Sequence, residues 1–280
     1  MSKQLAVLGS PISHSKSPAI HAAAYRVLNQ NFEYSKIQVE KNHLMQFVET
    51  LDPNWLGLSV TAPLKNEAFR LSRNSDEISQ LTGASNTLLR SNEGWDAFNT
   101  DVFGIQKALA EAGVSNAKIV SVIGSGATAQ SAVLAIARSF PETTLNLAAR
   151  NKDALSELIK FAHAVGLKRV RRVTLQQALS SADLVVTTLP ARAIDNEIAK
   201  LRAAWFRKPK GVLFDVAYDP WPSVAAKVWQ SSQLSVISGV EMLLWQAIAQ
   251  VRIFVGGNPG VELPNEAAVM LAMRDSIGLI

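Results

Sequence analysis

The stretch Lys118-Ile-Val-Ser-Val-Ile-Gly-Ser-Gly-Ala-Thr-Ala129 decides the fold of the second part of this chain. Its first six residues form a β-branched, apolar run of the kind that is buried on both faces of a parallel sheet. The glycines then follow a G-x-G-x-x-A pattern, and residues 131–138 have the composition of a helix. A strand, a glycine-rich turn and a helix in this order are typical of a dinucleotide-binding unit.

A small side chain is required at three positions of this turn, each for a different physical reason. Gly124 makes the tight turn, Gly126 lets the backbone approach a pyrophosphate, and Ala129 lets the helix pack closely on the strand. The helix N-terminus adds unpaired N–H groups and the positive end of a dipole. A tight turn without a ligand is the simpler alternative, but the flanking strand and helix favour a cofactor site. Its predicted residues are Gly124, Ser125, Gly126, Ala127, Thr128 and Ala129.

The end of the next predicted strand indicates which dinucleotide is bound. An NAD site needs Asp or Glu about 20 residues after the glycines, and residues 144–152 contain neither. Arg150 stands at the strand end with Lys152 just after it, and a guanidinium suits a 2′-phosphate. We therefore predict NADP rather than NAD, with a plain surface cation as the alternative for Arg150. Thr188 and Gly239 complete the predicted cofactor site.

Strand-like and helix-like segments alternate along the whole chain, which predicts an α/β fold with two domains. Repeated β–α–β spacing predicts a doubly wound parallel sheet, a Rossmann domain, over residues 104–238. Residues 1–103 form the other α/β domain, in which Ser17 is a candidate N-cap of a helix that opens at Pro18. Two helices, at 241–255 and 265–277, are expected to pack back on the first domain, which then comprises residues 1–103 and 239–280.

Composition excludes several classes of protein. With 48% hydrophobic and 18% charged residues among 280, the chain is not largely disordered. It contains no Cys, so it has no disulfides and no cysteine nucleophile, and its four His are too isolated to predict a metal site. No stretch reaches the roughly 18 apolar residues of a membrane-spanning helix, and the start lacks the core of a signal peptide. We expect a cytoplasmic protein that interacts with no membrane.

The positive charge is concentrated in one region. Residues 150–210 hold 13 Lys and Arg against 5 Asp and Glu, a net +8, whereas the whole chain is only +5. Such a region suits nucleic acid or an anionic small molecule. The densest run, Lys168-Arg-Val-Arg-Arg172, has no interleaved aromatic residues, so we interpret it as a solvated face and predict no nucleic-acid partner.

Four polar segments outside the glycine-rich unit are predicted to be loops at strand ends. They are Gly9-Ser-Pro-Ile-Ser-His-Ser-Lys-Ser-Pro-Ala-Ile-His21, Gly57-Leu-Ser-Val-Thr-Ala-Pro-Leu-Lys65, Gly83-Ala-Ser-Asn-Thr-Leu88 and Phe98-Asn-Thr-Asp101. Hydroxyl, amide and carboxylate groups gathered in loops are what recognition of a polyhydroxylated substrate requires.

Together with Gly239-Val-Glu-Met-Leu-Leu-Trp-Gln246, these segments resemble the shikimate dehydrogenase (shikimate 5-dehydrogenase) family. They are similar to its G-x-P-x-x-x-S-x-S-P-x-x-H, V-T-x-P-x-K, G-A-x-N-T, N-T-D and G-x-x-M-L-x-x-Q motifs. The resemblance runs from Ala6 to about Ile253. It implies a substrate domain and an NADP domain, and an oxidoreductase that interconverts 3-dehydroshikimate and shikimate in aromatic amino-acid biosynthesis.

The resemblance also implies roles for individual residues. Lys65 and Asp101 would form the catalytic pair, and which of them carries the proton is left open. Ser15 and Ser17 would hold the substrate carboxylate. The remaining substrate contacts would be Thr61, Asn86, Asp101, Tyr218 and Gln246. Ordinary structural roles, such as a turn for Asn86 or a satisfied polar group for Gln246, are the alternatives.

The chain departs from the family pattern at Ser59, where Asn is usual, at Ala127, where Gly is usual, and at Ala149, where Asn usually precedes the Arg. The change at Ser59 affects the hydrogen bonds of the substrate site, and the changes at Ala127 and Ala149 affect the binding and choice of cofactor. Three other functions stay open: a paralogue that also uses quinate and possibly NAD, a non-catalytic NADP-binding regulator, and a nucleic-acid-binding protein. A monomer or a homodimer is expected.

Overall fold

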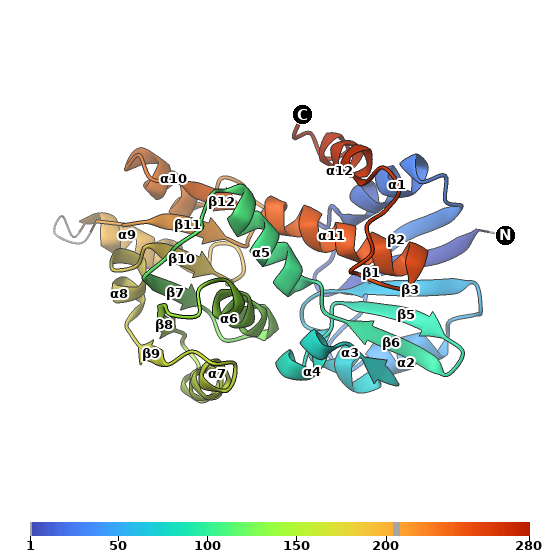
Figure 1. Ribbon diagram of the computed structural model, residues 1–280, viewed down its shortest axis with the longest axis horizontal. Helices are drawn as coiled ribbons and strands as arrows, with labels where there is room; N and C mark the ends of the chain where they lie inside the picture. The colour runs from blue at the N-terminus through green and yellow to red at the C-terminus, as the bar shows by residue number, and fades with distance from the viewer. Residues whose placement is uncertain (1, 204–207) are drawn as a thin grey trace. The chain divides into compact units, whose positions relative to one another are not determined.

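The computed structural model describes residues 2–203 and 208–280, and the chain divides into two compact units (Figure 1). One unit comprises Met1–Asp101 and Leu244–Ile280, and the other comprises Val102–Leu243. Helices α5 (Asp101–Glu111) and α11 (Gly239–Gly256) have residues in both units. Because each boundary falls inside or at the start of a helix, no loop-like composition marks it in the sequence.

The first unit contains a mixed six-stranded sheet with the order β2-β1-β3-β5-β6-β4. β1 pairs in parallel with β2 and β3, whereas β5 is antiparallel to both β3 and β6. The strands are β1 (Lys3–Gly9), β2 (Phe32–Gln38), β3 (Trp55–Val60), β4 (Asn74–Ser75), β5 (Thr87–Ser91) and β6 (Gly94–Phe98). The helices, besides most of α11, are α1 (Ser17–Val27), α2 (Leu44–Glu49), α3 (Lys65–Leu71), α4 (Glu77–Thr82) and α12 (Glu266–Asp275).

Two details of this unit correct the sequence-based expectations. Ser17 is the first residue of α1 and not its N-cap, which is Lys16. The chain turns at Ile12–Ser15, so the hydroxyl that accepts the Ser17 N–H is that of Ser15, at 3.3 Å. The polar segments at 83–88 and 98–101 also extend into the β5–β6 hairpin, since Thr87 and Leu88 belong to β5 and Phe98 belongs to β6.

The second unit is a parallel six-stranded sheet with the order β12-β11-β10-β7-β8-β9, which confirms the predicted doubly wound α/β fold. The strands are β7 (Ile119–Ile123), β8 (Thr144–Ala148), β9 (Arg169–Arg172), β10 (Leu184–Thr187), β11 (Val212–Asp215) and β12 (Val236–Ser238). Besides most of α5, the helices are α6 (Ala127–Ser139), α7 (Lys152–Ala164), α8 (Leu175–Ser180), α9 (Asp195–Ala203) and α10 (Val224–Ser231).

Side-chain caps begin several of these helices. Asn151 accepts the N–H groups of Asp153 and Ala154 at the start of α7, and Thr174 and Gln177 form a reciprocal capping box at α8. Each such cap satisfies N–H groups that have no partner within the helix and contributes about 0.5–2 kcal/mol. These local signals fix the residues at which the two helices begin.

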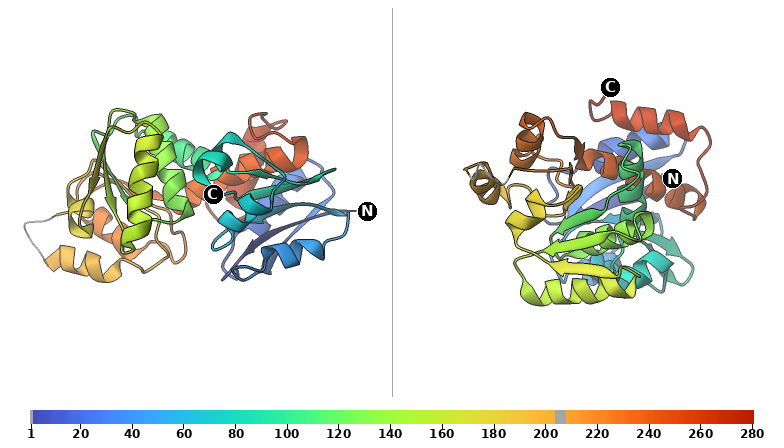
Figure 2. Two further views of the ribbon diagram at one scale, coloured as in Figure 1. Left: turned by 90° about the horizontal axis from the view of Figure 1, so that it is seen from below. Right: turned by 60° about the vertical axis from the view of Figure 1, so that its left-hand side comes forward.

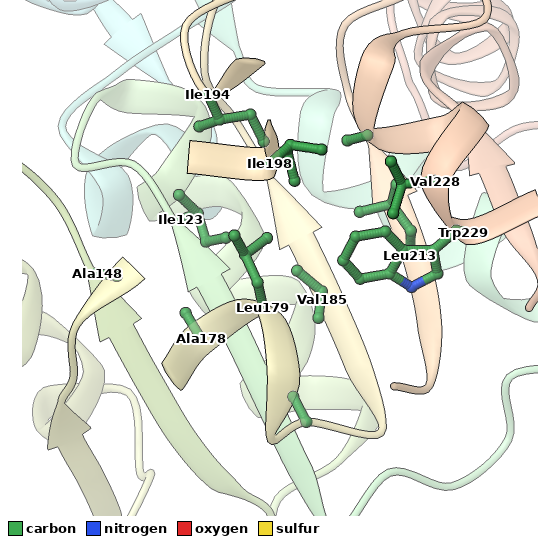
Figure 3. Packing of buried hydrophobic residues seen from close by; sticks show 12 residues of the cluster. Ile123, Ala148, Ala178, Leu179, Val185, Ile194, Ile198, Leu213, Val228 and Trp229 are labelled. Atoms are coloured by element: carbon green, nitrogen blue, oxygen red, sulfur yellow. The ribbon is translucent and has the colours of Figure 1, made fainter. Parts of the chain in front are cut away.

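An apolar cluster packs α8, α9 and α10 against the sheet of the second unit (Figure 3). The fully buried ring of Trp229 lies beside Leu213, and Val185 and Leu179 continue the cluster toward the centre of the sheet. Burial of large apolar side chains is the main favourable term for such a domain. Most residues of β7, β10 and β11 are apolar, as this burial requires.

The C-terminal helices pack on the first unit, as predicted (Figures 1 and 2). α12 lies against α1, and α11 lies so close to β3 that a Cβ atom on Gly57 would be 2.3 Å from the ring of Phe254. Arg252 and Glu266 form a two-point ion pair that ties α11 to α12. Within the two described ranges, no helix is both long and apolar enough to cross a membrane.

Candidate active site

Four connections of the first unit meet at one edge of its sheet. β1 and β3 are parallel, so the loops that follow Gly9 and Val60 leave from the same edge. β5 and β6 form an antiparallel hairpin beside β3, and their open end lies there too: Val60 N–H donates to the Asn86 carbonyl at 2.7 Å, and Asn86 N–H to that of Phe98 at 3.0 Å. Ligands of open α/β sheets bind at such strand ends.

A buried ion pair lies at this edge. Lys65 is the first residue of α3 and Asp101 the first residue of α5. The distance from Lys65 Nζ to Asp101 Oδ2 is 2.5 Å, and their side chains are 11% and 4% exposed. A pair removed from water is favourable only if the remaining acceptors are also hydrogen-bonded. The second carboxylate oxygen of Asp101 therefore needs a donor.

That donor is the side chain of Asn86, which lies just before β5 and is 2% exposed. Its Nδ2 donates to Asp101 Oδ1 at 2.8 Å and to Thr100 Oγ1 at 2.9 Å. Its Oδ1 accepts the backbone N–H of Thr100 at 2.9 Å. Since an ionised carboxylate only accepts, the nitrogen end of the amide must face Asp101. Gln246 Oε1 lies 3.3 Å from the same Nδ2.

Asn99 and Thr100 belong to this hydrogen-bonded arrangement, although the sequence predicts no separate role for either residue. Asn99 Oδ1 accepts the Asp101 N–H at 3.0 Å, and its Nδ2 donates to Thr82 Oγ1 and the Ala84 carbonyl, both at 3.0 Å. These bonds fix the start of α5. The only sequence signal for them is their position next to Asp101 in a polar segment.

The predicted carboxylate-binding serines lie at the N-terminus of α1. Ser15 is half-buried and Ser17 is 6% exposed, so two hydroxyls lie at the first turn, where the Ser17 N–H already donates to Ser15 Oγ and Pro18 has no N–H. Both hydroxyls can donate a hydrogen bond to an anion. Thr61, at the end of β3, donates its N–H to the Leu8 carbonyl at 2.8 Å, and its methyl would lie 2.4 Å from a Cβ on Gly9. Glycine at that position lets the two loops approach.

Two glutamines of α11 reach the same edge. Gln246 and Gln250 are one helical turn apart, 9% and 2% exposed. Gln250 bonds to Ser59, Asn86 and Thr87, whereas only Gln246 is predicted as a site residue from the sequence. Two amides at i and i+4 within an otherwise apolar helix are the signal that could have identified Gln250.

A neutral aromatic cluster lies behind Gln250. The His21 ring stacks on Tyr34, with 4.0 Å between centroids, and its Nδ1 lies 3.0 Å from the Tyr25 hydroxyl. Burial lowers the pKa of His21 from 6.5 to about 3, opposed by the Gln250 amide. Burial also raises the pKa of both Tyr25 and Tyr34, so all three side chains are uncharged at neutral pH.

The second unit holds the predicted cofactor residues at the carboxyl edge of its own sheet. Gly124 has φ +125°, and a Cβ there would lie 2.2 Å from Thr188 Oγ1. Thr188 itself donates N–H and hydroxyl to the Ile123 carbonyl at 2.9 and 3.0 Å. A Cβ on Gly126, the N-cap of α6, would meet nothing within 4 Å. This open space beside free helix N–H groups fits a pyrophosphate.

Arg150 and Lys152 flank Asn151, the N-cap of α7, after the end of β8. Both cationic side chains are exposed. They lie one strand over from the glycine turn, since β7 and β8 are parallel neighbours. This is the position that a 2′-phosphate on the adenosine ribose would require.

The two remaining predicted residues lie elsewhere in the second unit. Gly239 begins α11, where a Cβ would lie 2.0 Å from the Val216 carbonyl oxygen. Tyr218 is half-buried after β11, and burial together with the charge of Asp219 raises its pKa. Tyr218 is thus on a different unit from the other predicted substrate residues.

Comparison with known proteins agrees with this geometry. A family model for the shikimate dehydrogenase substrate binding domain matches residues 7–88. A shikimate dehydrogenase (NADP(+)) of Leptospira interrogans is 30% identical over 265 residues, which cover 93% of this chain and 91% of the relative. The chain belongs to the shikimate dehydrogenase family.

Solved structures of the family have the same fold. The shikimate dehydrogenase of Mycobacterium tuberculosis has a TM-score of 0.83 and 35% identity, covering 98% of this chain and 99% of its own. The Thermus thermophilus enzyme, solved in complex with NADP(H) and shikimate, has a TM-score of 0.81 and 25% identity, with coverage of 98% and 99%. A model of the ornithine cyclodeaminase/mu-crystallin family also matches residues 106–208, within the second unit.

The buried His21 predicts how this shikimate dehydrogenase homologue responds to acid. The unfolded chain binds a proton near pH 6.5, whereas folded His21 does so only near pH 3. The contribution of neutral His21 to the free energy of unfolding is therefore fully present above pH 6.5. As the pH falls from 6.5 toward 3, the free energy of unfolding decreases by up to about 1.4 kcal/mol per pH unit.

Urea unfolding between pH 7.5 and 5 would measure how steeply the free energy of unfolding depends on pH. We expect His21→Phe, which keeps the stacking surface, to be less stable at pH 7.5 but to show a flatter dependence. His43→Gln, at an exposed histidine, should keep the wild-type slope. An unchanged slope in His21→Phe would contradict the assignment.

Proposed function

We propose that this protein is an NADP(H)-dependent oxidoreductase that interconverts shikimate and 3-dehydroshikimate. The observation that carries the proposal is the buried Lys65–Asp101 pair, held by Asn86 at a sheet edge lined by hydroxyls and amides. Relatives that cover nine-tenths of the chain are named as NADP(+)-dependent shikimate dehydrogenases. The intact pair argues against a non-catalytic cofactor-binding regulator.

The second unit supports the choice of cofactor. Residues 124–129 would hold the pyrophosphate, Thr188 and Gly239 would line the site, and Arg150 with Lys152 would contact the 2′-phosphate. The bound nicotinamide supplies hydride chemistry. We propose residues 104–238 as the cofactor domain and residues 1–103 with 239–280 as the substrate domain.

The residues of the first unit then take the following roles. Oxidation of the substrate alcohol removes a hydride from carbon and a proton from its hydroxyl. The Lys65–Asp101 pair accepts that proton and returns it in the reverse direction, while the Lys65 ammonium stabilises charge on the oxygen. Ser15 and Ser17 bind the carboxylate. The other substrate contacts in this unit are Thr61, Asn86, Asp101 and Gln246, and Tyr218 of the second unit is proposed as a further contact.

A cytoplasmic location, a monomer or homodimer, and the lack of a nucleic-acid partner stay predictions. The run Lys168–Arg172 includes edge strand β9, and its exposed Lys168 and Arg169 both face Glu142, with N···O distances of 3.9 and 3.8 Å. These contacts support its interpretation as a solvated face.

Initial rates of nicotinamide reduction test the proposed activity. Shikimate and quinate are each paired with NADP+ and with NAD+, and we expect the rate with shikimate and NADP+ to dominate because the site offers hydroxyl contacts and Arg150. Dominant quinate oxidation or NAD+ use would place the protein with a paralogue. No activity with any pair would contradict the proposed function.

Lys65→Ala tests the proton-transfer role. Loss of acid–base catalysis costs at least about a hundredfold in turnover, and we expect the dissociation constant for NADP+ to stay unchanged. Lys65→Arg keeps a cation beside Asp101 but should also be slow, which separates proton transfer from charge pairing. Lys41→Ala, at an exposed lysine of the same unit, is the control. Near-normal turnover of both Lys65 variants would refute the role.

Arg150→Asp tests the 2′-phosphate contact. We expect NADP+ to bind far more weakly and NAD+ to be little affected, because only NADP+ carries the phosphate that the guanidinium would pair with. Calorimetric titration with NADP+ and with NAD+ gives the ratio of their dissociation constants. Lys168→Asp makes the same charge change just before β9 and should leave the ratio of the two dissociation constants unaltered. Equal losses for NADP+ and NAD+ in Arg150→Asp would contradict the contact.

A further inference from the structure

Gln250 is a buried polar side chain whose hydrogen-bonding groups all have partners. It lies in α11 at 2% exposure, among residues that are mostly apolar. Its Nε2 donates to the Asn86 carbonyl and to Thr87 Oγ1, both at 3.0 Å, and its Oε1 accepts from Ser59 Oγ at 2.9 Å. One amide thus joins the end of β3 to the start of β5, where Ser59 and Thr87 are register partners.

The direction of these hydrogen bonds is fixed. A backbone carbonyl can only accept, so the nitrogen of Gln250 must face the Asn86 carbonyl, and the Ser59 hydroxyl must donate to the oxygen. The second N–H of Gln250 then donates to Thr87 Oγ1. Thr87 has a single hydroxyl proton, and it donates this proton to Asn86 Oδ1 at 2.9 Å.

This chain of donors ends at the ion pair. With its oxygen held by the Thr87 hydroxyl and by the Thr100 backbone N–H, the Asn86 amide can present only its nitrogen to Asp101. A rotated Asn86 would place its oxygen against the carboxylate, and two acceptors without a proton between them repel. The relay therefore runs from Gln250 through Thr87 and Asn86 to Asp101, and from there to Lys65.

We propose that Gln250 is a positioning residue that acts through Thr87, which holds the Asn86 amide oxygen together with the Thr100 N–H, and that Gln250 thereby contributes to the geometry of Asp101 and Lys65. Gln250 meets Asn86 at the backbone carbonyl and not at the side-chain amide. The inference rests on the proposed function, because it assigns the relay to the dehydrogenase site. The chain departs from the family pattern at Ser59, and Gln250 is the partner of that hydroxyl.

Steady-state kinetics of three variants test the relay. Gln250→Leu removes both donors with little change in volume, and Thr87→Val removes the hydroxyl that connects Gln250 to Asn86. We expect each to lower kcat/KM for shikimate by ten- to a hundredfold, mostly through kcat, with the NADP+ dissociation constant unchanged. Ser59→Ala removes only the bond to the amide oxygen and should stay within about threefold of wild type.

The double variant separates a relay from independent structural damage. If Gln250 acts through Thr87, Gln250→Leu/Thr87→Val should be no slower than the slower single variant, since coupled residues are not additive. Multiplicative losses, or wild-type kcat/KM in folded Gln250→Leu, would overturn the proposal. Active protein is counted by NADP+ titration, so a partly unfolded variant is not mistaken for a slow one.

A crystal structure of Gln250→Leu gives a readout that does not depend on activity. We expect the Asn86 side chain to rotate, or to lose its 2.8 Å contact with Asp101. An unmoved Asn86 would overturn the inference even if the enzyme oxidises shikimate. Wild-type protein without shikimate activity but with a rotated Asn86 in the variant would instead contradict the proposed function and leave the relay standing.

Discussion

The orientation of the Asn86 side-chain amide is the constraint on which the active-site edge depends. The amide has a donor end and an acceptor end, and at 2% exposure it cannot exchange a lost bond for one to water. Its donor end meets Asp101 and its acceptor end meets Thr100 and Thr87. The ends of β3 and β6, the start of β5 and one face of α11 must therefore all be in place before the carboxylate is held.

Such a network does not stabilise the fold by itself. Removing Lys65 and Asp101 from water costs free energy that their attraction recovers only in part. The surrounding apolar contacts supply the stability, for example the Phe254 ring against Gly57, which presses α11 onto β3. The polar side chains at the strand ends are held in place by the apolar contacts around them. His21, which lies behind Gln250, is neutral and adds no charge to this site.

The features that could be predicted from the sequence are those determined by residues adjacent to one another in the chain. The β-branched run before Gly124 identified a buried parallel strand, and the glycine spacing identified a turn that the structure forms with φ +125° at Gly124. Ser17 shows the limit, because its pattern fits an N-cap and a first helical residue equally well. The turn that Ile12 and Ser15 form upstream decided between them.

The sequence by itself determined the α/β class, the glycine turn and the polar segments at strand ends, because periodicity and turn chemistry act over a few residues. Only the tertiary structure decided which of those polar groups meet. Gln250 and Asn86 are separated by 164 residues, and Lys65 and Asp101 by 36. The only local sign that separates Gln250 from a tolerated glutamine in a helix is its spacing of one turn from Gln246. Its role exists because β3, β5 and α11 are packed so closely that one buried amide must satisfy groups from both strands.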